Sequence, residues 1–203
     1  MAVRFDVLIV GGGHGGAQAA IALRQHGFEG SVAILTDEPY LPYERPPLSK
    51  DYLAGEKEFE RLLIRPPAFW ADRNIVLRLA TRAVALDPDA KSVTTADGAT
   101  IRYGALIWAA GGVPRRLACP GADLPGIHAI RSRDDTDHIR AMLPGLKRIA
   151  IIGGGYIGLE AAAALRGLGH EIVVIEALDR LLNRVAGPPI STFYATEHRT
   201  RGV

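Results

Sequence analysis

Two short apolar runs, each followed by a glycine-rich turn and an alanine-rich stretch, dominate the hydrophobic pattern of the chain. The run FDVLIV at 5–10 precedes GGGHGGAQAAIALRQHG at 11–27, and RIAII at 148–152 precedes GGGYIGLEAAAALRGLG at 153–169. The two glycine-led stretches lie 142 positions apart and agree at 10 of 17 positions. Short apolar runs bounded by glycine favour buried strands, and the alanine-rich stretches favour helices. The pattern predicts two copies of one strand–turn–helix unit.

The segment between the two copies reads as β-rich. Short β-branched runs at 74–78, 82–87, 92–97 and 99–103 are separated by turn residues, which is typical of a meander. ALIWAAGG at 105–112 reads as a separate buried strand that meets a glycine turn, and DDTDHIRAML at 134–143 as a short amphipathic helix. After the second copy, EIVVIE at 171–176 predicts a strand and 188–202 a helix.

Each copy carries the spacing G-x-G-x-x-G between strand and helix. The glycines are Gly11, Gly13 and Gly16 in the first copy, and Gly153, Gly155 and Gly158 in the second. Dinucleotide-binding turns need glycine for the tight turn, for close approach of a pyrophosphate, and for packing of helix against strand. The anion then lies at the positive helix N-terminus. The pair of fingerprints predicts two dinucleotide sites.

A carboxylate about 20 residues after the last glycine would bind the ribose hydroxyls. Asp37 and Glu38 lie 21 and 22 residues past Gly16, and Glu176 lies 18 past Gly158. The spacing does not separate Asp37 from Glu38.

The segment LPYERPPLSKDYL at 41–53 is stiffened by three prolines, each of which fixes its φ angle. It holds two cations, Arg45 and Lys50, and Ser49 is suited to cap the N-terminus of a short helix. Preorganised charge requires such rigid support. We therefore expect Arg45 and Lys50 to face a bound group and not to be solvated loop cations.

Composition excludes several classes. The 203 residues carry 24 basic and 22 acidic side chains without a long run of like charge, so nothing indicates nucleic-acid binding. The single Cys119 excludes an internal disulfide and a C-x-x-C redox pair, and the six histidines show no metal-binding spacing. The N-terminus is too short for a signal peptide, and no apolar run spans a bilayer. We expect a cytoplasmic protein with no metal and no membrane partner.

Taken together, GGGHGG, PYERPPLSK, LIWAAGG and IGGGYIGLEAAAAL resemble the FAD-dependent, NADH-using ferredoxin reductases of bacterial oxygenase systems, of the putidaredoxin reductase type. The resemblance covers essentially the whole chain but only the N-terminal half of that family's pattern. It implies an α/β fold of two Rossmann-like three-layer units with a β-meander insert, the second unit incomplete. It also implies an FAD-binding domain at 1–114, an NADH-binding domain at 115–203, and bare apolar surface beside strands 105–109 and 171–176.

The activity implied is hydride transfer from NADH to FAD, followed by single-electron transfer to a 2Fe-2S ferredoxin that serves an oxygenase. The resemblance places Lys50 and Glu160 at the reacting rings. The residues expected to bind FAD are Gly11, Gly13, His14, Gly15, Gly16, Asp37, Glu38, Arg45, Lys50, Ala83, Ala109, Gly111 and Arg131. Those expected to bind NADH are Gly153, Gly155, Tyr156, Ile157, Gly158 and Glu176.

Two other functions compete with this hypothesis. A disulfide reductase needs a redox-active cysteine pair, and Cys119 has no second cysteine to pair with. A non-catalytic dinucleotide-binding or redox-signalling module would need only the two glycine turns.

Overall fold

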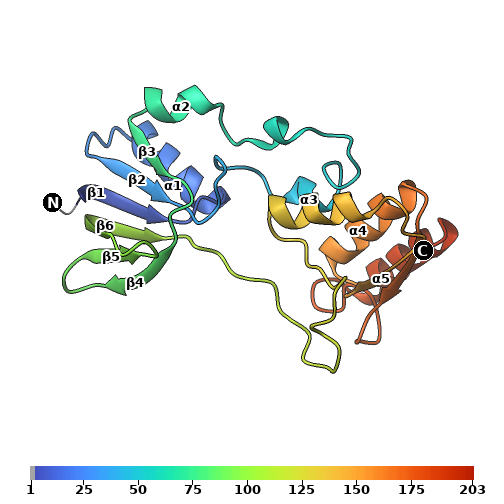
Figure 1. The fold of residues 1–203 in the computed structure, drawn as a ribbon. Helices are drawn as coiled ribbons and strands as arrows, with labels where there is room; N and C mark the ends of the chain where they lie inside the picture. The colour runs from blue at the N-terminus through green and yellow to red at the C-terminus, as the bar shows by residue number, and fades with distance from the viewer. Residues whose placement is uncertain (1–2) are drawn as a thin grey trace. The chain divides into compact units, whose positions relative to one another are not determined.

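The computed structural model describes residues 3–203, which divide into two compact units (Figure 1). The first contains the residues up to Glu44 and Leu62–Gly112. The second contains Arg45–Arg61 and Val113–Val203. The proline-rich segment, which from here on means Arg45–Arg61, therefore leaves the first unit after Glu44 and packs within the second, and the chain returns to the first unit at Leu62. Among the helices of residues 3–203, none is both long and apolar enough to cross a bilayer.

The first unit is built on one mixed sheet of six strands in the order β3-β2-β1-β6-β5-β4. The strands are β1 (Val3–Val10), β2 (Val32–Leu35), β3 (Ile75–Arg78), β4 (Ala83–Asp87), β5 (Ser92–Thr95) and β6 (Thr100–Trp108). The neighbours β3, β2, β1 and β6 are parallel, whereas β5 is antiparallel to both β6 and β4. The predicted α/β fold with a meander is confirmed for this unit.

Two details of the meander prediction are wrong. The run at 74–78 is not a meander strand, because β3 pairs in parallel with β2 at the edge of the sheet. The runs at 99–103 and 105–112 are not two strands, because β6 continues from Thr100 to Trp108 and pairs with both β5 and β1. Gly104, which separated them in the sequence pattern, instead lets β6 pass close to β1: a Cβ at this position would lie 2.7 Å from the carbonyl oxygen of Asp6.

Apolar side chains cover both faces of this sheet. On one face α1 (His14–Gln25) buries Ala17, Ala20 and Ile21 against alternate residues of β1 and β2. The short α2 (Pro67–Asp72) adds the buried Trp70 to the same cluster. The opposite face carries a second cluster, in which Val93 of β5 is buried with residues of β1, β2 and β6.

The second unit contains three longer helices and a two-stranded parallel sheet. Its elements are α3 (Arg133–Met142), β7 (Arg148–Ile152), α4 (Tyr156–Gly167), β8 (Glu171–Ile175) and α5 (Pro188–Thr200). Ser132 caps α3 and forms a reciprocal capping box with Asp135. The imidazole Nε2 of His198 lies 3.0 Å from the carbonyl oxygen of Leu159, so α5 lies along α4.

Only one face of the β7–β8 sheet is covered among the residues described. Ile149, Ile151 and Ile172 pack in a cluster with α4, whereas Val173 and Ile175 are 49% and 51% exposed. This unit was expected to be incomplete, and the predicted three-layer arrangement is seen only in part: helix α4 covers one face of the sheet, and no other described element of the second unit covers the other face. The expected bare apolar surface is confirmed, and Trp108 at the end of β6 is also 57% exposed.

A pair of glycine substitutions tests the close approach of β6 to β1. Gly104→Ala should lower the free energy of unfolding by about 1–3 kcal/mol, because the added methyl group meets the Asp6 carbonyl and the backbone must shift. Gly167→Ala at the end of α4 meets nothing within 4 Å and should be neutral or stabilising by about 0.5–1 kcal/mol. Chemical denaturation of the three chains measures both effects, and equal stability of the Gly104→Ala chain would contradict the continuous β6.

Candidate functional site

The first glycine turn joins the end of β1 to α1. Gly11 has φ 119°, and a Cβ there would lie 2.1 Å from the carbonyl oxygen of Ala109. The amide of Ala109 donates to the carbonyl of Val10 at 2.7 Å, so the strand-end turn after β6 lies directly on this loop. Gly111, also at positive φ, follows in that turn. The structure thus brings Gly11, Ala109 and Gly111 together, as expected for residues of one site.

The three glycines of this turn have different surroundings. A Cβ on Gly16 would lie 1.9 Å from the Gly11 carbonyl oxygen, so Gly16 is required for packing of helix against turn. A Cβ on Gly13 would meet nothing within 4 Å. Gly13 caps α1 without a side-chain hydrogen bond, and His14 and Gly15 are exposed in the first helical turn. The open space at Gly13 and the uncapped amides fit an anionic group such as a pyrophosphate.

The second glycine turn repeats this geometry. Gly153 has φ 110°, and a Cβ on Gly158 would lie 2.1 Å from its carbonyl oxygen. A Cβ on Gly155 would meet nothing within 4 Å, and α4 likewise begins without a side-chain cap. Tyr156 and Ile157, the first residues of α4, are 48% and 58% exposed. The second turn therefore also leaves room for a dinucleotide backbone.

Glu176 follows β8 and is tied to the second glycine turn. Its Oε2 accepts the amide of Gly154 at 2.7 Å, and its Oε1 accepts the amide of Leu178 at 2.9 Å. The amide of Leu178, and after it that of Gly154, holds the pKa of Glu176 below its ordinary value of 4.5. This carboxylate is ionised and fixed beside the turn near neutral pH.

The acids of the first unit are displaced relative to Glu176. The amide of Gly11 donates to Leu35, as that of Gly153 donates to Ile175, so the counterpart of Glu176 is Thr36. A Cβ on Gly12 would meet the Thr36 side chain at 2.7 Å, which agrees with that alignment. The sequence pattern missed this, because the link between the first helix and its following strand is two residues longer than in the second copy.

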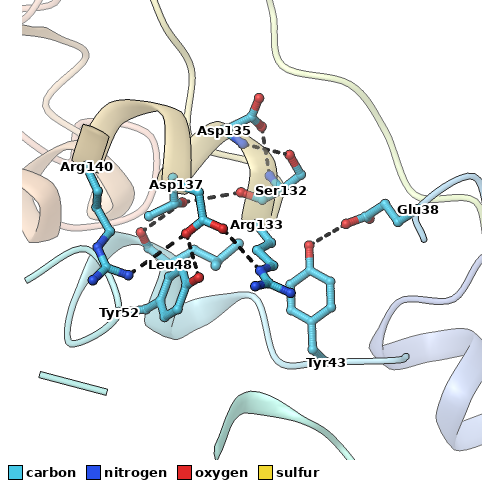
Figure 2. A network of polar contacts seen from close by, with 10 residues as sticks. Glu38, Tyr43, Leu48, Tyr52, Ser132, Arg133, Asp135, Asp137 and Arg140 are labelled. Carbon is cyan, nitrogen blue, oxygen red and sulfur yellow. Dashed lines mark hydrogen bonds and ion pairs between the residues drawn. The ribbon is translucent and has the colours of Figure 1, made fainter. Parts of the chain in front are cut away.

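Asp37 and Glu38 then lie one and two residues beyond the counterpart position. Asp37 is exposed, whereas the Glu38 carboxylate accepts a hydrogen bond from the hydroxyl of Tyr43 (Figure 2). Ala83, expected near the adenine, begins β4 and is half-buried beside the cluster on the same sheet. Roles for these three residues at a nucleotide stay predictions.

The proline-rich segment forms a 3₁₀ helix, η1 (Pro46–Ser49), and a second one, η2 (Phe59–Leu62), follows. The expectation that Ser49 caps the start of a helix is wrong, because Ser49 is the last residue of η1. Its buried hydroxyl instead donates to Oε2 of Glu160 at 2.8 Å. The neighbouring Lys50 ammonium lies 3.0 Å from Oε1 of the same carboxylate. The two predicted catalytic residues, Lys50 and Glu160, thus form an ion pair.

Arg45 and Arg131, both expected at FAD, also come together. The guanidinium Nη1 of Arg45 donates to the carbonyl oxygen of Arg131 at 2.7 Å. Both belong to the second unit, as do Lys50 and Glu160.

A polar network on α3 was missed by the sequence analysis. The hydroxyl of Tyr52 donates to Oδ1 of Asp137 at 2.6 Å, and Nε of Arg133 donates to Oδ2 at 3.1 Å (Figure 2). Burial, and after it the hydrogen bond to Asp137, raises the pKa of Tyr52. The i,i+4 spacing of Arg133 and Asp137 was a readable signal, but nothing in the sequence indicated that Tyr52, 85 positions away, would join them.

Within residues 3–203, no three His, Cys, Asp or Glu side chains gather as a metal site would require. Cys119 is exposed and carries no disulfide.

The depressed pKa of Glu176 predicts a pH-dependent stability. A carboxylate whose folded pKa is lowered stabilises the fold above its unfolded pKa, near 4.5, and this contribution is lost as pH falls through the folded value. Glu176→Gln should lower the free energy of unfolding by about 1 kcal/mol at pH 7, since both backbone amides lose a charged acceptor and one of them then faces the NH₂ group of glutamine. The difference in free energy of unfolding between Glu176→Gln and the unaltered chain should shrink in denaturation curves measured below pH 4.5. A difference independent of pH would show that the charge of Glu176 does not matter.

Comparisons with known proteins agree with this geometry. Residues 5–203 match the family described as pyridine nucleotide-disulphide oxidoreductase. A ferredoxin–NAD(P)+ reductase from Sphingomonas sp is 58% identical over 199 residues, which is 98% of this chain and 48% of that protein. The ferredoxin reductase for the CYP199A2 system from Rhodopseudomonas palustris superposes with a TM-score of 0.93 at 38% identity, covering 98% of this chain and 49% of that one.

The putidaredoxin reductase chain solved in covalent complex with putidaredoxin gives a TM-score of 0.91 at 37% identity, covering 100% of this chain and 49% of that one. The chain therefore spans about half the length of the relatives it matches. The resemblance to ferredoxin reductases of the putidaredoxin reductase type is confirmed as homology. With both glycine turns on its two α/β units and a family match over residues 5–203, the chain belongs to the pyridine nucleotide-disulphide oxidoreductase family.

Proposed function

We propose that this chain binds FAD at the first glycine turn and NADH at the second, and that it carries the dinucleotide-binding part of a cytoplasmic NADH:ferredoxin reductase. In this proposal, residues 1–114 serve FAD and residues 115–203 serve NADH. The flavin supplies the chemistry of accepting hydride and releasing electrons singly.

The observation that carries the proposal is the duplicated open turn. Gly13 and Gly155 each have room for a ligand, and each lies at the uncapped start of a helix. Gly16 and Gly158 in contrast are closed by backbone contacts. Two such turns on two separate sheets suit two dinucleotides, whereas a single-nucleotide protein would need only one.

Lys50 and Glu160 provide the charged groups for the reacting rings. The Lys50 side chain is 42% exposed and that of Glu160 is 30% exposed, so both remain accessible to a ligand. Lys50 would place a positive charge where the reduced ring gains negative charge. Glu160 holds that cation, and Ser49 fixes the carboxylate from its other oxygen.

Glu176 favours NADH over NADPH. Its carboxylate is held ionised by two backbone amides at the end of β8, where a ribose would lie. It can accept from ribose hydroxyls through its remaining lone pairs, but it would repel a 2′-phosphate.

A ferredoxin is the proposed electron acceptor. The relatives named above are ferredoxin reductases, and one of them was solved joined to putidaredoxin. The lone exposed Cys119 leaves this chain without the dithiol of a disulfide reductase.

An absorbance spectrum of the purified chain tests the proposal most simply. A flavin spectrum that bleaches on anaerobic addition of NADH supports it, and reduction of a 2Fe-2S ferredoxin completes it. A colourless protein that neither binds added FAD nor oxidises NADH would contradict the proposal and favour a non-catalytic module.

Substitutions at Gly13 and Gly155 should separate the loss of FAD binding from the loss of NADH binding. Gly13→Ala should fold normally yet lose most of its FAD affinity, because the methyl group has room in the protein but occupies the space proposed for the pyrophosphate. Gly155→Ala should keep its FAD and weaken NADH binding instead. Flavin content per chain and titration with NADH measure the two effects. Gly16→Ala is the contrasting variant, since its clash with the Gly11 carbonyl should impair folding itself. Unchanged affinity in both open-glycine variants would exclude these turns as the sites.

Loss of the Lys50 charge should make the flavin harder to reduce. Lys50→Met should lower the midpoint potential of bound FAD, with an effect of about 1–3 kcal/mol, the magnitude of a charged hydrogen bond. Lys57→Met removes a lysine from the same segment and serves as the control. Spectroelectrochemical titration measures the potentials, and equal shifts in the two variants would remove the specific role of Lys50.

A further inference from the structure

The ion pair between Lys50 and Glu160 cannot hold the proline-rich segment in place by itself. With side chains 42% and 30% exposed, such a pair contributes only about 0–1 kcal/mol. Both oxygens of Glu160 are nevertheless engaged within 3.0 Å, by Lys50 and by Ser49. Hydrogen bonds weaken steeply with displacement, so this geometry depends on an external support for the segment.

Two adjacent residues of α3 supply that support on either side of Lys50. The hydroxyl of Thr136 lies 3.3 Å from the carbonyl oxygen of Leu48, two residues before Lys50. The carboxylate of Asp137 accepts from Tyr52, two residues after it, at 2.6 Å. Figure 2 shows Leu48 and Tyr52 beside this part of α3. The chain on either side of Lys50 is therefore attached to one turn of one helix, through the Leu48 carbonyl and the Tyr52 hydroxyl.

Burial shows that the segment is seated on the second unit. Leu48 and Leu53 are 1% exposed and Tyr52 is 3% exposed, and Leu53 lies in the same core cluster as Ala161 of α4. Lys50 differs from these buried residues: it lies between Leu48 and Tyr52 in the sequence, and its side chain remains accessible.

Asp137 is the centre of the attachment. Besides Tyr52, its carboxylate faces Arg133 at 3.1 Å and Arg140 at 3.9 Å, both from α3. The Arg133 guanidinium also lies 3.8 Å from the centre of the Phe59 ring, and that of Arg140 lies 5.0 Å from the centre of the Tyr52 ring. One carboxylate thus orients two guanidinium groups that cover aromatic rings of the segment.

We propose that Asp137, together with Thr136, is a positioning residue that sets the place of Lys50 against Glu160. The value of this placement for hydride transfer rests on the proposed function, but the placement itself is a property of this chain alone. Asp137 binds the hydroxyl of Tyr52, whereas Glu160 binds Lys50, so Asp137 acts on Lys50 through Tyr52.

The test observes Lys50 directly. The chain has four lysines, so labelling the lysine ε-carbons with ¹³C gives a simple NMR spectrum in which Lys50→Arg assigns the Lys50 signal. Lys57, Lys91 and Lys147 act as internal references. Glu160→Gln defines the shift of a Lys50 that has lost its ionised partner.

Asp137→Ala and Tyr52→Phe should each move the Lys50 signal toward the Glu160→Gln position, and their combination should move it no further than either alone. Asp137→Glu should restore it, since a carboxylate again reaches Tyr52. Glu197→Gln is the matched control, because it removes an i,i+4 partner of Arg201 on α5 at the same 3.1 Å distance and should leave Lys50 unchanged. If Asp137→Ala does not fold, Asp137→Asn and Tyr52→Phe decide.

A Lys50 signal that stays in place in every folded Asp137 and Tyr52 variant, while Glu160→Gln moves it, would overturn the proposal. A second measurement separates this outcome from failure of the proposed function. In FAD-loaded protein, Asp137→Ala should slow flavin reduction by NADH by roughly tenfold or more, the scale of a small misplacement. If no FAD binds, the proposed function fails, but the lysine spectra still decide whether Asp137 positions Lys50.

Discussion

The contact of a helix with the carbonyl of its own glycine turn is the constraint on which both units depend. A Cβ on Gly16 would lie 1.9 Å from the carbonyl oxygen of Gly11, and one on Gly158 would lie 2.1 Å from that of Gly153, so only glycine allows α1 and α4 to start where they do. Each helix then begins without a side-chain cap, and the space beside Gly13 or Gly155 is open. The open turn proposed to bind a pyrophosphate is therefore a consequence of packing, and it arises twice.

A second dependence concerns the proline-rich segment. It is flanked by residues of the first unit, where Glu44 donates its amide to Leu62 at 2.8 Å, yet its own buried residues pack on α3 and α4 of the second unit. Lys50 and Arg45 therefore take their positions from the second unit, although they lie between strands of the first in the sequence. The position of Lys50 therefore depends on contacts with α3, a helix that lies far from it in the sequence.

Much of the fold and both glycine turns could be predicted from the sequence, because the signals for them are local. Glycine spacing, most of the strand pattern and the helix predicted at 134–143 each depend on neighbours within a few residues, and these features appear in the structure. The continuity of β6 was missed because Gly104 reads as a break, whereas in the sheet it is the residue that allows close passage by Asp6. Ser49 was misassigned because its partner, Glu160, lies 111 residues away. The attachment through Tyr52 and Asp137 was invisible for the same reason.

The central claim is that the two turns are separate sites for two dinucleotides. Isothermal titration of the chain with FAD, followed by titration of the FAD-loaded chain with NADH, measures this directly. The account predicts one FAD and one NADH per chain, with the second binding event undiminished by the first. Competition between the two nucleotides for a single site, or binding of neither, would contradict it.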